Sequence, residues 1–466
     1  MYKLLPVLKR DDQEPLFLQL YSQIKNEIVN GNLKRNDKLP SKRQLANSLQ
    51  CSQNTIQAAY NQLVDEGYLV SRPKSGFYVA EIDGILNIQS AAPVATESKR
   101  QHSDVIFDFS YQGVDLSHFP FATWRRITKN VINESDKELL QVCDPQGYFE
   151  LRSVIARYLK HSRGVSCSSE QIIISSGTEF LIQLLIQLFD RRFVYAIENP
   201  GYEKLPMIFR SSRAEFRSIS LDKFGVNPDE LVRKHANIAC ITPSHQFPSG
   251  IIMPISRRIE LLNWANENPD RYIIEDDYDS EFRYSGKPIP SLQGLDENGK
   301  VIYISAFSKS LSPGLRISYM VLPEKLLEIY RKDLNFYICP VPTIEQKVMQ
   351  RFMDDGHFER HLNRMRNLYK QKREKLVLAA RKELTGISIE GATAGLHLVL
   401  KVNNGLSEDQ LIQKAEEHGI KVYGMSRFLP EKTPGSQSCK IIIGFASLDI
   451  MDIDDAVSRL SKAWQK

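Results

Sequence analysis

The stretch SAFSKSLSPGLRIS, Ser305–Ser318, places a single lysine on a serine-rich turn between two apolar runs. The lysine is Lys309, and Arg316 follows it by seven residues. A solvated loop lysine would account for this turn taken alone. The flanking runs, VIYIS and RISYMVL, are continuously apolar, which is typical of strands covered on both faces. The turn is therefore predicted to lie at the end of a buried strand.

Similar apolar runs recur from about residue 105 onward and alternate with helical segments. They read QIIIS, RFVYAIE, IACIT and RYIIED, and together with the first two runs they predict a mostly parallel α/β sheet. Ligands of such sheets bind where the strands end at their carboxyl edge. Polar motifs follow four of these strands: SSGTEF, ENPGYEK, EDDYDSEF and the lysine turn. We expect these motifs to converge on one site.

One cofactor, pyridoxal 5′-phosphate (PLP), uses all the groups that these motifs offer. Its aldehyde requires a lysine, its pyridinium N–H a carboxylate, and its phosphate a helix N-terminus, hydroxyls and a cation. We expect Lys309 to be the Schiff-base lysine, Asp276 to pair with the pyridinium and Tyr278 to donate to the ring hydroxyl. The other predicted cofactor contacts are Tyr202 at the ring and Gly177, Thr178, Ser308 and Arg316 at the phosphate. Each motif alone is common, but their joint occurrence favours a PLP site.

The first eighty residues follow a different pattern. LFLQLYSQIKNEIVNG repeats an apolar residue every four positions, which predicts a helix ending near Gly31. LPSKRQLANSL predicts a short helix capped by Ser41, and SQNTIQAAYNQLVDEGYL predicts a third helix capped by Ser52. YLVSRPKSGFYVA then predicts a β-hairpin with a basic tip. Together these elements predict a winged helix-turn-helix that is mainly α with a β-hairpin wing.

A winged helix-turn-helix binds DNA through the start of its third helix and through basic side chains around it. Residues 1–80 hold eleven Lys/Arg and seven Asp/Glu, which is most of the net charge of +5 of the whole chain. The alternative is a small helical domain whose exposed face is merely polar. The predicted DNA contacts are Gln53, Asn54, Thr55 and Gln57 at base edges and Lys42, Arg43, Arg72 and Lys74 at phosphates or the minor groove.

The stretches LPSKRQLANSLQCSQNTI and SRPKSGF resemble the GntR family of bacterial regulators. The resemblance implies that Arg43, Gln53, Gln57 and Gly76 lie at the DNA. Two of these positions are often arginine in that family, and glutamine in their place favours adenine readout over guanine contacts.

From Val105 to the C-terminus the chain resembles fold type I aminotransferases, and the joint architecture resembles the MocR/GabR subfamily of GntR regulators. The resemblance rests on DPQGYFELRSVIARYL, TPSHQFPSG, IIEDDYDSEFRY and SAFSKSLSPGLRISYMVLP. It implies a PLP-bound effector domain that senses an amino compound in a homodimer with chains paired head-to-tail. It also implies that Arg427 and Lys204 bind the effector carboxylate, although Arg427 could equally be a surface arginine in a loop.

The chain departs from the aminotransferase pattern in two places. Ala306 stands where relatives carry Ser or Thr, which removes a phosphate hydroxyl. Ile442 stands on the strand KIIIGFASL where aminotransferases carry an arginine for the substrate carboxylate. An apolar side chain cannot form the bidentate pair that orients an α-amino acid. His245, Gln246 and Phe247 occupy the region where the enzymes use an asparagine at the ring oxygen.

These patterns divide the chain into domains. Residues 81–104 lose periodicity and gather Ala, Pro, Thr and Ser, which is typical of a tether. The predicted domains are a winged helix-turn-helix at 1–80, a linker at 81–104 and an aminotransferase-like PLP/effector-binding domain at 105–466, with a large part at about 140–340 and a small α+β part at about 341–466.

Cysteine usage and hydropathy indicate the compartment. The six cysteines are far apart and form no CxxC pair, which favours reduced thiols in a cytoplasmic protein and neither a disulfide frame nor a metal site. The most apolar helical segment, FLIQLLIQLF, is too short for a bilayer, which needs about 20 residues. We therefore expect no membrane partner.

These observations favour a PLP-dependent transcriptional regulator. We expect it not to be an enzyme, apart from a residual transaminase half-reaction. An amine or amino-acid effector would form an external aldimine with PLP, free Lys309 and alter operator DNA binding by the homodimer. Two alternatives stay open: an active aminotransferase carrying a DNA-binding module, and a DNA-binding protein whose enzyme-like domain has lost its cofactor. Ile442 argues against the first alternative, and Lys309, Asp276 and Arg316 together argue against the second.

Overall fold

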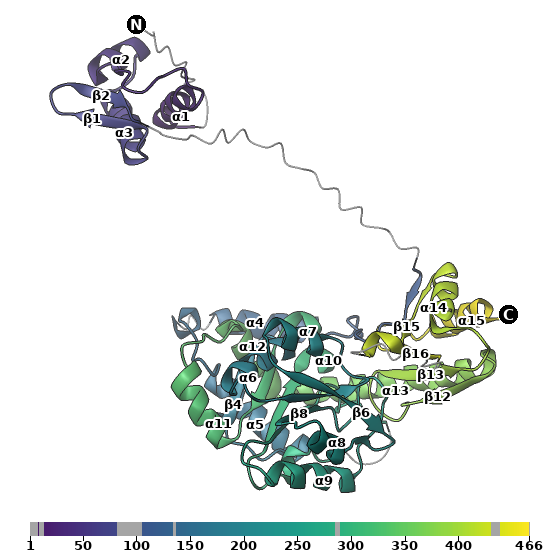
Figure 1. Ribbon diagram of the computed structural model, residues 1–466. Coiled ribbons are helices and arrows are strands. Elements are labelled where there is room, and N and C mark those ends of the chain that lie inside the picture. Colours follow the sequence, from purple (N-terminus) through teal and green to yellow (C-terminus); the bar gives the residue numbers. More distant parts are fainter. Residues whose placement is uncertain are drawn as a thin grey trace. The chain divides into compact units, whose positions relative to one another are not determined.

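The chain forms two compact units, Met1–His102 and Ser103–Lys466 (Figure 1). The computed structural model describes residues 8, 14–81, 105–133, 137–284, 289–429 and 439–465. The predicted linker, 81–104, lies outside the described residues except for Glu81. Among the helices described, none is long and apolar enough to cross a membrane.

The N-terminal unit is a winged helix-turn-helix, as predicted. Ser41 caps the second helix and forms a reciprocal capping box with Gln44, and Ser52 accepts the backbone N–H of Thr55 at the start of the third. The hairpin pairs in antiparallel register from Leu69 opposite Val79. Its elements are α1 (Leu16–Val29), α2 (Lys42–Leu49), α3 (Gln53–Asp65), β1 (Leu69–Arg72) and β2 (Gly76–Val79).

The core of this unit comes from the residues that the helical periodicity placed inward. Leu20, Ile24, Ile56, Tyr60 and Leu63 are fully buried. The three helices and the hairpin share this single cluster, so the wing is attached to the helices by apolar packing.

The C-terminal unit is built on a large mixed sheet in the order β4-β11-β10-β9-β8-β5-β6-β7. Neighbours from β10 through β6 are parallel, while β11 runs antiparallel between β10 and β4. The predicted α/β fold is thus confirmed. The strands are β4 (Ile172–Ser175), β5 (Tyr195–Asn199), β6 (Phe216–Asp222), β7 (Gly225–Val226), β8 (Ile238–Ile241), β9 (Tyr272–Asp276), β10 (Val301–Ala306) and β11 (Ser318–Val321).

Helices cover both faces of this sheet, which explains its continuously apolar strands (Figure 1). Successive residues of a strand point to opposite faces, so Ile274 packs with one set of helices and Ile273 with the other. The first set is α6 (Thr178–Leu188), α7 (Lys204–Ser211) and α11 (Glu324–Ile329), and the second is α8 (Pro228–Arg233) and α9 (Ile255–Asn266).

A smaller antiparallel sheet, in the order β12-β13-β16-β15, lies towards the C-terminus. It shares one apolar core with the large sheet, because Ile174 of β4 and Leu398 of β13 belong to the same cluster. The elements of this part are β12 (Ile387–Glu390), β13 (His397–Val402), β15 (Tyr423–Gly424), β16 (Lys440–Gly444), α12 (Thr343–Asp354), α13 (His357–Glu383), α14 (Glu408–Glu417) and α15 (Ile453–Trp464).

The residues that open the C-terminal unit form a separate two-stranded sheet with a segment near the C-terminus. β3 (Phe107–Asp108) pairs in parallel with β14 (Ile420–Lys421), more than three hundred residues away. This pairing carries the following segment, including Tyr111, towards the carboxyl edge of the large sheet.

The strands β4, β5, β8, β9 and β10 all end at one edge of the large sheet, since they run in the same direction. The helix α6 begins directly after β4, and the short helix α10 (Phe307–Ser310) begins directly after β10. The polar motifs therefore meet where parallel sheets bind ligands.

Candidate functional site

A cavity of about 210 Å³ lies at this edge of the large sheet. All eight cofactor residues expected from the sequence line it: Tyr202, Gly177, Thr178, Asp276, Tyr278, Ser308, Lys309 and Arg316. The structure therefore brings together side chains that are up to 139 residues apart in sequence, from Gly177 to Arg316. Lys204 and Ala306 line the same cavity.

Five further lining residues were not predicted from the sequence: Tyr111, Gln112, Glu179, Thr242 and Pro313. Thr242 follows β8 directly, so the rule that ligands gather at strand ends would have found it. Tyr111 reaches the cavity only through the pairing of β3 with β14, for which no local signal exists.

Lys309 lies on α10 and is half-buried. Its Nζ donates a hydrogen bond to the carbonyl oxygen of Tyr111 at 2.8 Å. Burial lowers the pKa of this ammonium to about 8, although Asp279 acts in the opposite direction. A lysine with a pKa near neutrality supplies a useful fraction of free amine, which is the form that attacks a carbonyl carbon.

Asp276 ends β9, and its Oδ1 is buried with no hydrogen-bond partner among the described residues. Burial raises the pKa of Asp276 to about 7, and Asp277 and Glu198 add to the effect. A buried acceptor without a donor is uncommon in folded proteins. This oxygen fits a ligand that brings its own N–H, as the pyridinium of PLP does.

The start of α6 forms a closely packed cradle. Gly177 is the N-cap residue, with φ of +113°, and its N–H donates to Ser318 Oγ at 2.7 Å. Arg316, with φ of +51°, lies beside it and donates from Nη2 to the Ser176 carbonyl at 2.8 Å. A helix N-terminus next to a guanidinium and the hydroxyl of Thr178 fits a phosphate.

Glu179, in the first turn of α6, balances the cations at this cavity. It accepts a hydrogen bond from Lys204 Nζ at 2.7 Å, and Arg316 Nη2 lies 3.4 Å from its other oxygen. Burial favours the neutral acid, but the bonds and charges of these cations outweigh burial and lower the pKa of Glu179 to about 2. Both cations are thus already paired with a carboxylate.

Aromatic side chains form the rest of the wall. Tyr202 donates to Glu179 at 3.4 Å, and the Tyr278 hydroxyl lies 3.1 Å from His245 Nδ1. Burial and neighbouring carboxylates raise the pKa of both tyrosines, so both stay neutral donors. Phe247 lines the cavity, whereas His245 and Gln246 of the same segment do not.

The two departures from the aminotransferase pattern lie at this cavity. Ala306 lines it without a hydroxyl. Ile442, on β16, is fully buried and packs in a cluster with Tyr111 and Phe247, which form the wall. An apolar side chain therefore supports the wall at the position where aminotransferases carry an arginine for the substrate carboxylate.

Arg427 is not among the residues that line this cavity. It lines an adjacent hollow of about 130 Å³, and its Nε lies 4.0 Å from Glu203 Oε1. Tyr202 lines both hollows, so the two are neighbours. Arg427 and Lys204 therefore line two different hollows, and Tyr202 lies at the boundary between them.

The residues predicted to contact DNA lie at the surface of the N-terminal unit. Gln53 and Asn54 are exposed at the start of α3, and Thr55 bonds through its hydroxyl to Ser52 at 2.9 Å. Lys42 donates to Gln57, which ties the start of α2 to α3.

The other basic residues lie on α2 and on the wing. Arg43 on α2 and Lys74 at the hairpin tip are exposed, and Lys74 has φ of +59°. Arg72 donates to Asn36 at 2.7 Å and stacks on a tyrosine ring of the wing. Gly76 opens β2 with φ of +114°, a conformation that favours glycine.

Family models match both units. The model of bacterial regulatory proteins of the gntR family matches residues 16–79, and the model of aminotransferase class I and II matches residues 111–460. The chain is 40% identical to the HTH-type transcriptional regulator YdeL of Bacillus subtilis over 99% of each chain. It is 32% identical to the probable rhizopine catabolism regulatory protein MocR of Rhizobium meliloti, over 98% of this chain and 95% of MocR. The chain belongs to the MocR-type family of HTH-type transcriptional regulators.

Solved aminotransferases share the fold of the C-terminal unit of this MocR-type regulator. The multiple substrate aminotransferase of Thermococcus profundus is 25% identical, with a TM-score of 0.68 over 78% of this chain and 92% of the enzyme. The prediction of a DNA-binding regulator that fuses a GntR domain to a fold type I aminotransferase domain is confirmed.

Proposed function

We propose that this regulator binds PLP at Lys309 and that an amine or amino-acid effector, captured at the same site, changes its binding to operator DNA. The observation that carries the proposal is Asp276 Oδ1, a buried oxygen to which no described residue donates, in the cavity that also holds Lys309 and the Arg316 cradle. PLP, when bound, supplies an aldehyde that links reversibly to primary amines.

Each group of side chains has a role in holding the cofactor. The Thr178 N–H and hydroxyl, with Ser308 and Arg316, would hold the phosphate, and Gly177 would let it approach the backbone closely while its own N–H stays bonded to Ser318 Oγ. Asp276 accepts the ring N–H, Tyr278 donates to the ring oxygen and Tyr202 packs near the ring. Lys309 would hold the aldehyde carbon when no effector is present, and its lowered pKa favours the free amine that such a link needs.

The cations near the cavity favour an effector that carries a carboxylate. Lys204 lies at the cavity and Arg427 in the neighbouring hollow, and each has an acidic partner. An effector carboxylate would take the place of Glu179 or Glu203 at one of these cations. Its binding would therefore rearrange side chains on α7, which packs on the large sheet, or near β15 of the small sheet.

Turnover as an aminotransferase is the second candidate, and Lys309 with Asp276 supports it. Ile442 weighs against efficient turnover, because an apolar residue cannot pair with the carboxylate of an α-amino acid. A regulator needs only reversible capture of the amine, which this cavity can provide.

We also propose that the regulator acts as a homodimer in the cytoplasm. Leu140, Val142, Phe336 and Ile338 are more than half exposed, and surfaces of this kind often mark protein interfaces. Sedimentation at micromolar concentration tests this point, and a monomer would contradict it.

The test of the proposed function is operator binding measured with and without amines. Wild-type protein should change its DNA affinity when the effector is added, and Lys309→Ala should bind DNA with the affinity of effector-free protein whatever is added. Lys325→Ala, which removes an exposed lysine of α11, is the matched control and should respond as wild type. An effector response that survives in Lys309→Ala would contradict the proposal.

A further inference from the structure

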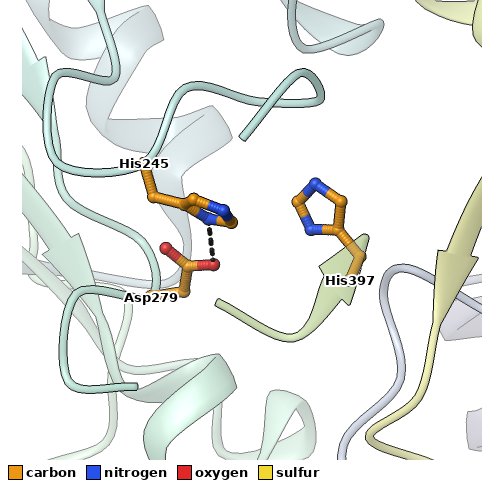
Figure 2. A group of neighbouring side chains, drawn as sticks. All are labelled: His245, Asp279 and His397. Carbon is orange, nitrogen blue, oxygen red and sulfur yellow. Dashed lines mark hydrogen bonds and ion pairs between the residues drawn. The ribbon is translucent and has the colours of Figure 1, made fainter. Parts of the chain in front are cut away.

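A buried cluster of three side chains lies beside the cavity: His245, Asp279 and His397 (Figure 2). His245 and Asp279 lie on the segments that follow β8 and β9, whereas His397 is the first residue of β13 in the small sheet. Each of the three is only 2% exposed. The proposed function assigns no role to any of them.

The hydrogen bonds of His245 determine where its proton lies. Its Nδ1 is 2.9 Å from Asp279 Oδ2 and 3.1 Å from the hydroxyl oxygen of Tyr278. A carboxylate oxygen only accepts, so the Nδ1–H of the imidazole must donate to Asp279. A nitrogen that carries this proton cannot accept the proton of Tyr278. The acceptors left for the Tyr278 hydroxyl proton are the Asp279 carboxylate, with which it also hydrogen-bonds, and a ligand in the cavity that it lines. His245 already bonds to Asp279 Oδ2, which favours donation into the cavity.

The backbone and the small sheet hold His245 in this position. Gly395 has φ of +72°, and a Cβ there would lie 2.1 Å from His245 Cε1 and 2.5 Å from Asp279 Oδ2. The ring of His397 has its centroid 5.1 Å from that of His245, and its Nε2 lies 3.0 Å from the Pro248 carbonyl oxygen. His245 therefore has little freedom to rotate.

The same three side chains offer ligand atoms within 4.8 Å of one another, as a metal site would. Metal ligands lie about 2.0–2.2 Å from an ion, so an ion would have to break the bond between His245 and Asp279. The backbone at Gly395 also fills the space beside the imidazole. Hydrogen bonding alone therefore explains why these three side chains lie together. The experiment below also tests for metal binding.

We propose that His245 and Asp279 are positioning residues that direct the hydroxyl proton of Tyr278 into the cavity, where it donates to the ring oxygen of the cofactor. This inference rests on the proposed function, because it needs a PLP ring beside Tyr278. Phe247, the neighbouring wall residue, has no side-chain donor, so at this part of the wall the hydrogen bond must come from Tyr278. The carboxylates that face Tyr278 are Asp279, Asp276 and Glu198, and burial together with these charges keeps its pKa well above 10.

The test follows the visible absorbance of the PLP-loaded full chain as the pH is raised. A donor at the ring oxygen stabilises its deprotonated form, so the loss of the donor raises the pH midpoint. Tyr278→Phe sets the scale, with an expected rise of about one pH unit. Asp279→Asn and His245→Phe should each raise the midpoint by at least half of that amount.

Two further variants separate positioning from general damage. Gly395→Ala removes no polar group but displaces His245, so its midpoint should also rise. Tyr330→Phe is the control, because the buried Tyr330 hydroxyl donates to the Pro145 carbonyl at 3.2 Å and lines neither the cavity nor the cluster, so its loss should leave the midpoint unchanged. Melting curves of the PLP-free variants verify that each one folds.

The outcomes distinguish this inference from the proposed function. Wild-type protein that binds no PLP would refute the proposed function, and the inference with it. The positioning role alone would be refuted if the pH midpoint rises in Tyr278→Phe but stays at the wild-type value in Asp279→Asn and His245→Phe. Stoichiometric binding of Co²⁺ to PLP-free protein, lost in His397→Asn, would also overturn it in favour of a metal site.

Discussion

A methyl group on the α-carbon of Gly177 would lie 2.0 Å from Nη2 of Arg316. The guanidinium is therefore packed directly against the backbone at the N-terminus of α6, and the Ser176 carbonyl holds it there at 2.8 Å. The two residues are 139 positions apart in sequence, yet they form one cradle of positive charge. The first prediction follows from this contact.

Gly177→Ala should abolish PLP binding while the fold persists. The added methyl group has no room unless Arg316 moves, and φ of +113° is strained for alanine by about 1–3 kcal/mol. We expect at least a tenfold loss of PLP affinity, measured by equilibrium dialysis. Gly225→Ala, with a similar φ of +102° on β7, is the matched control and should bind PLP normally. Equal losses in both variants would show that strain and not the cradle is responsible.

Glu179→Gln should tighten PLP binding. The Glu179 carboxylate pairs with Lys204 and competes for Arg316, so its removal leaves more positive charge for the phosphate. Since these side chains are partly exposed, we expect a gain of about 0.5–1 kcal/mol, or roughly two- to fivefold in affinity. Glu267→Gln, which breaks a surface pair with Arg271, should have no effect on PLP. Weaker binding by Glu179→Gln would mean that Glu179 orders the cradle.

Asp276→Asn should stabilise the PLP-free protein at high pH and also abolish its function. Burial, Asp277 and Glu198 raise the folded pKa of Asp276 to about 7, whereas the unfolded value is about 3.9. The folded state holds an extra proton between these values, so stability falls as the pH rises from about 4 to about 7. Above about pH 7 the folded wild type carries a buried negative charge, which lowers its free energy of unfolding. Asp276→Asn removes this charge.

Thermal melting at two pH values measures this effect. At pH 8, Asp276→Asn should raise the free energy of unfolding by about 1 kcal/mol or more, and near pH 4 it should come close to wild type. PLP affinity should fall at least tenfold at pH 8, because the ring N–H loses its charged partner. A variant that is destabilised at pH 8 would refute the assigned environment of Asp276.

Arg43→Ala should weaken DNA binding without affecting the cofactor site. The side chain is exposed on α2, where a cation can reach phosphates. We expect a loss of affinity on all sequences and a decrease of about 1 in the slope of log affinity against log salt. Lys160→Ala removes one exposed charge from the C-terminal unit and serves as the control. A simultaneous loss of PLP absorbance in Arg43→Ala would contradict the division of roles.

The sequence predicts that the eight expected cofactor contacts meet in one cavity, because the motifs that carry them lie at strand ends on a shared sheet edge. Asp276, Gly177 and Lys309 are read from local motifs, and the parallel strands then place them together. Tyr111 could not be found in this way, since β3 joins the site by pairing with a distant strand. Strand β6 was missed too, because it is only partly buried and does not form a continuous apolar run.

Pairings between charged residues are also hidden from the sequence. An acidic residue in the first turn of a helix, such as Glu179, is explained by the helix dipole alone. Its bonds to Lys204 and Arg316 appear only once three separate segments meet. His245 and His397 likewise look like two unrelated histidines until the small sheet packs against the large one.

The central claim is a covalent link between PLP and Lys309, and reduction with borohydride followed by peptide mass spectrometry tests it most directly. The account predicts one phosphopyridoxyl adduct per chain, on the peptide that contains Lys309, and none in Lys309→Ala. An unmodified Lys309 in protein saturated with PLP, or an adduct confined to other lysines, would contradict it.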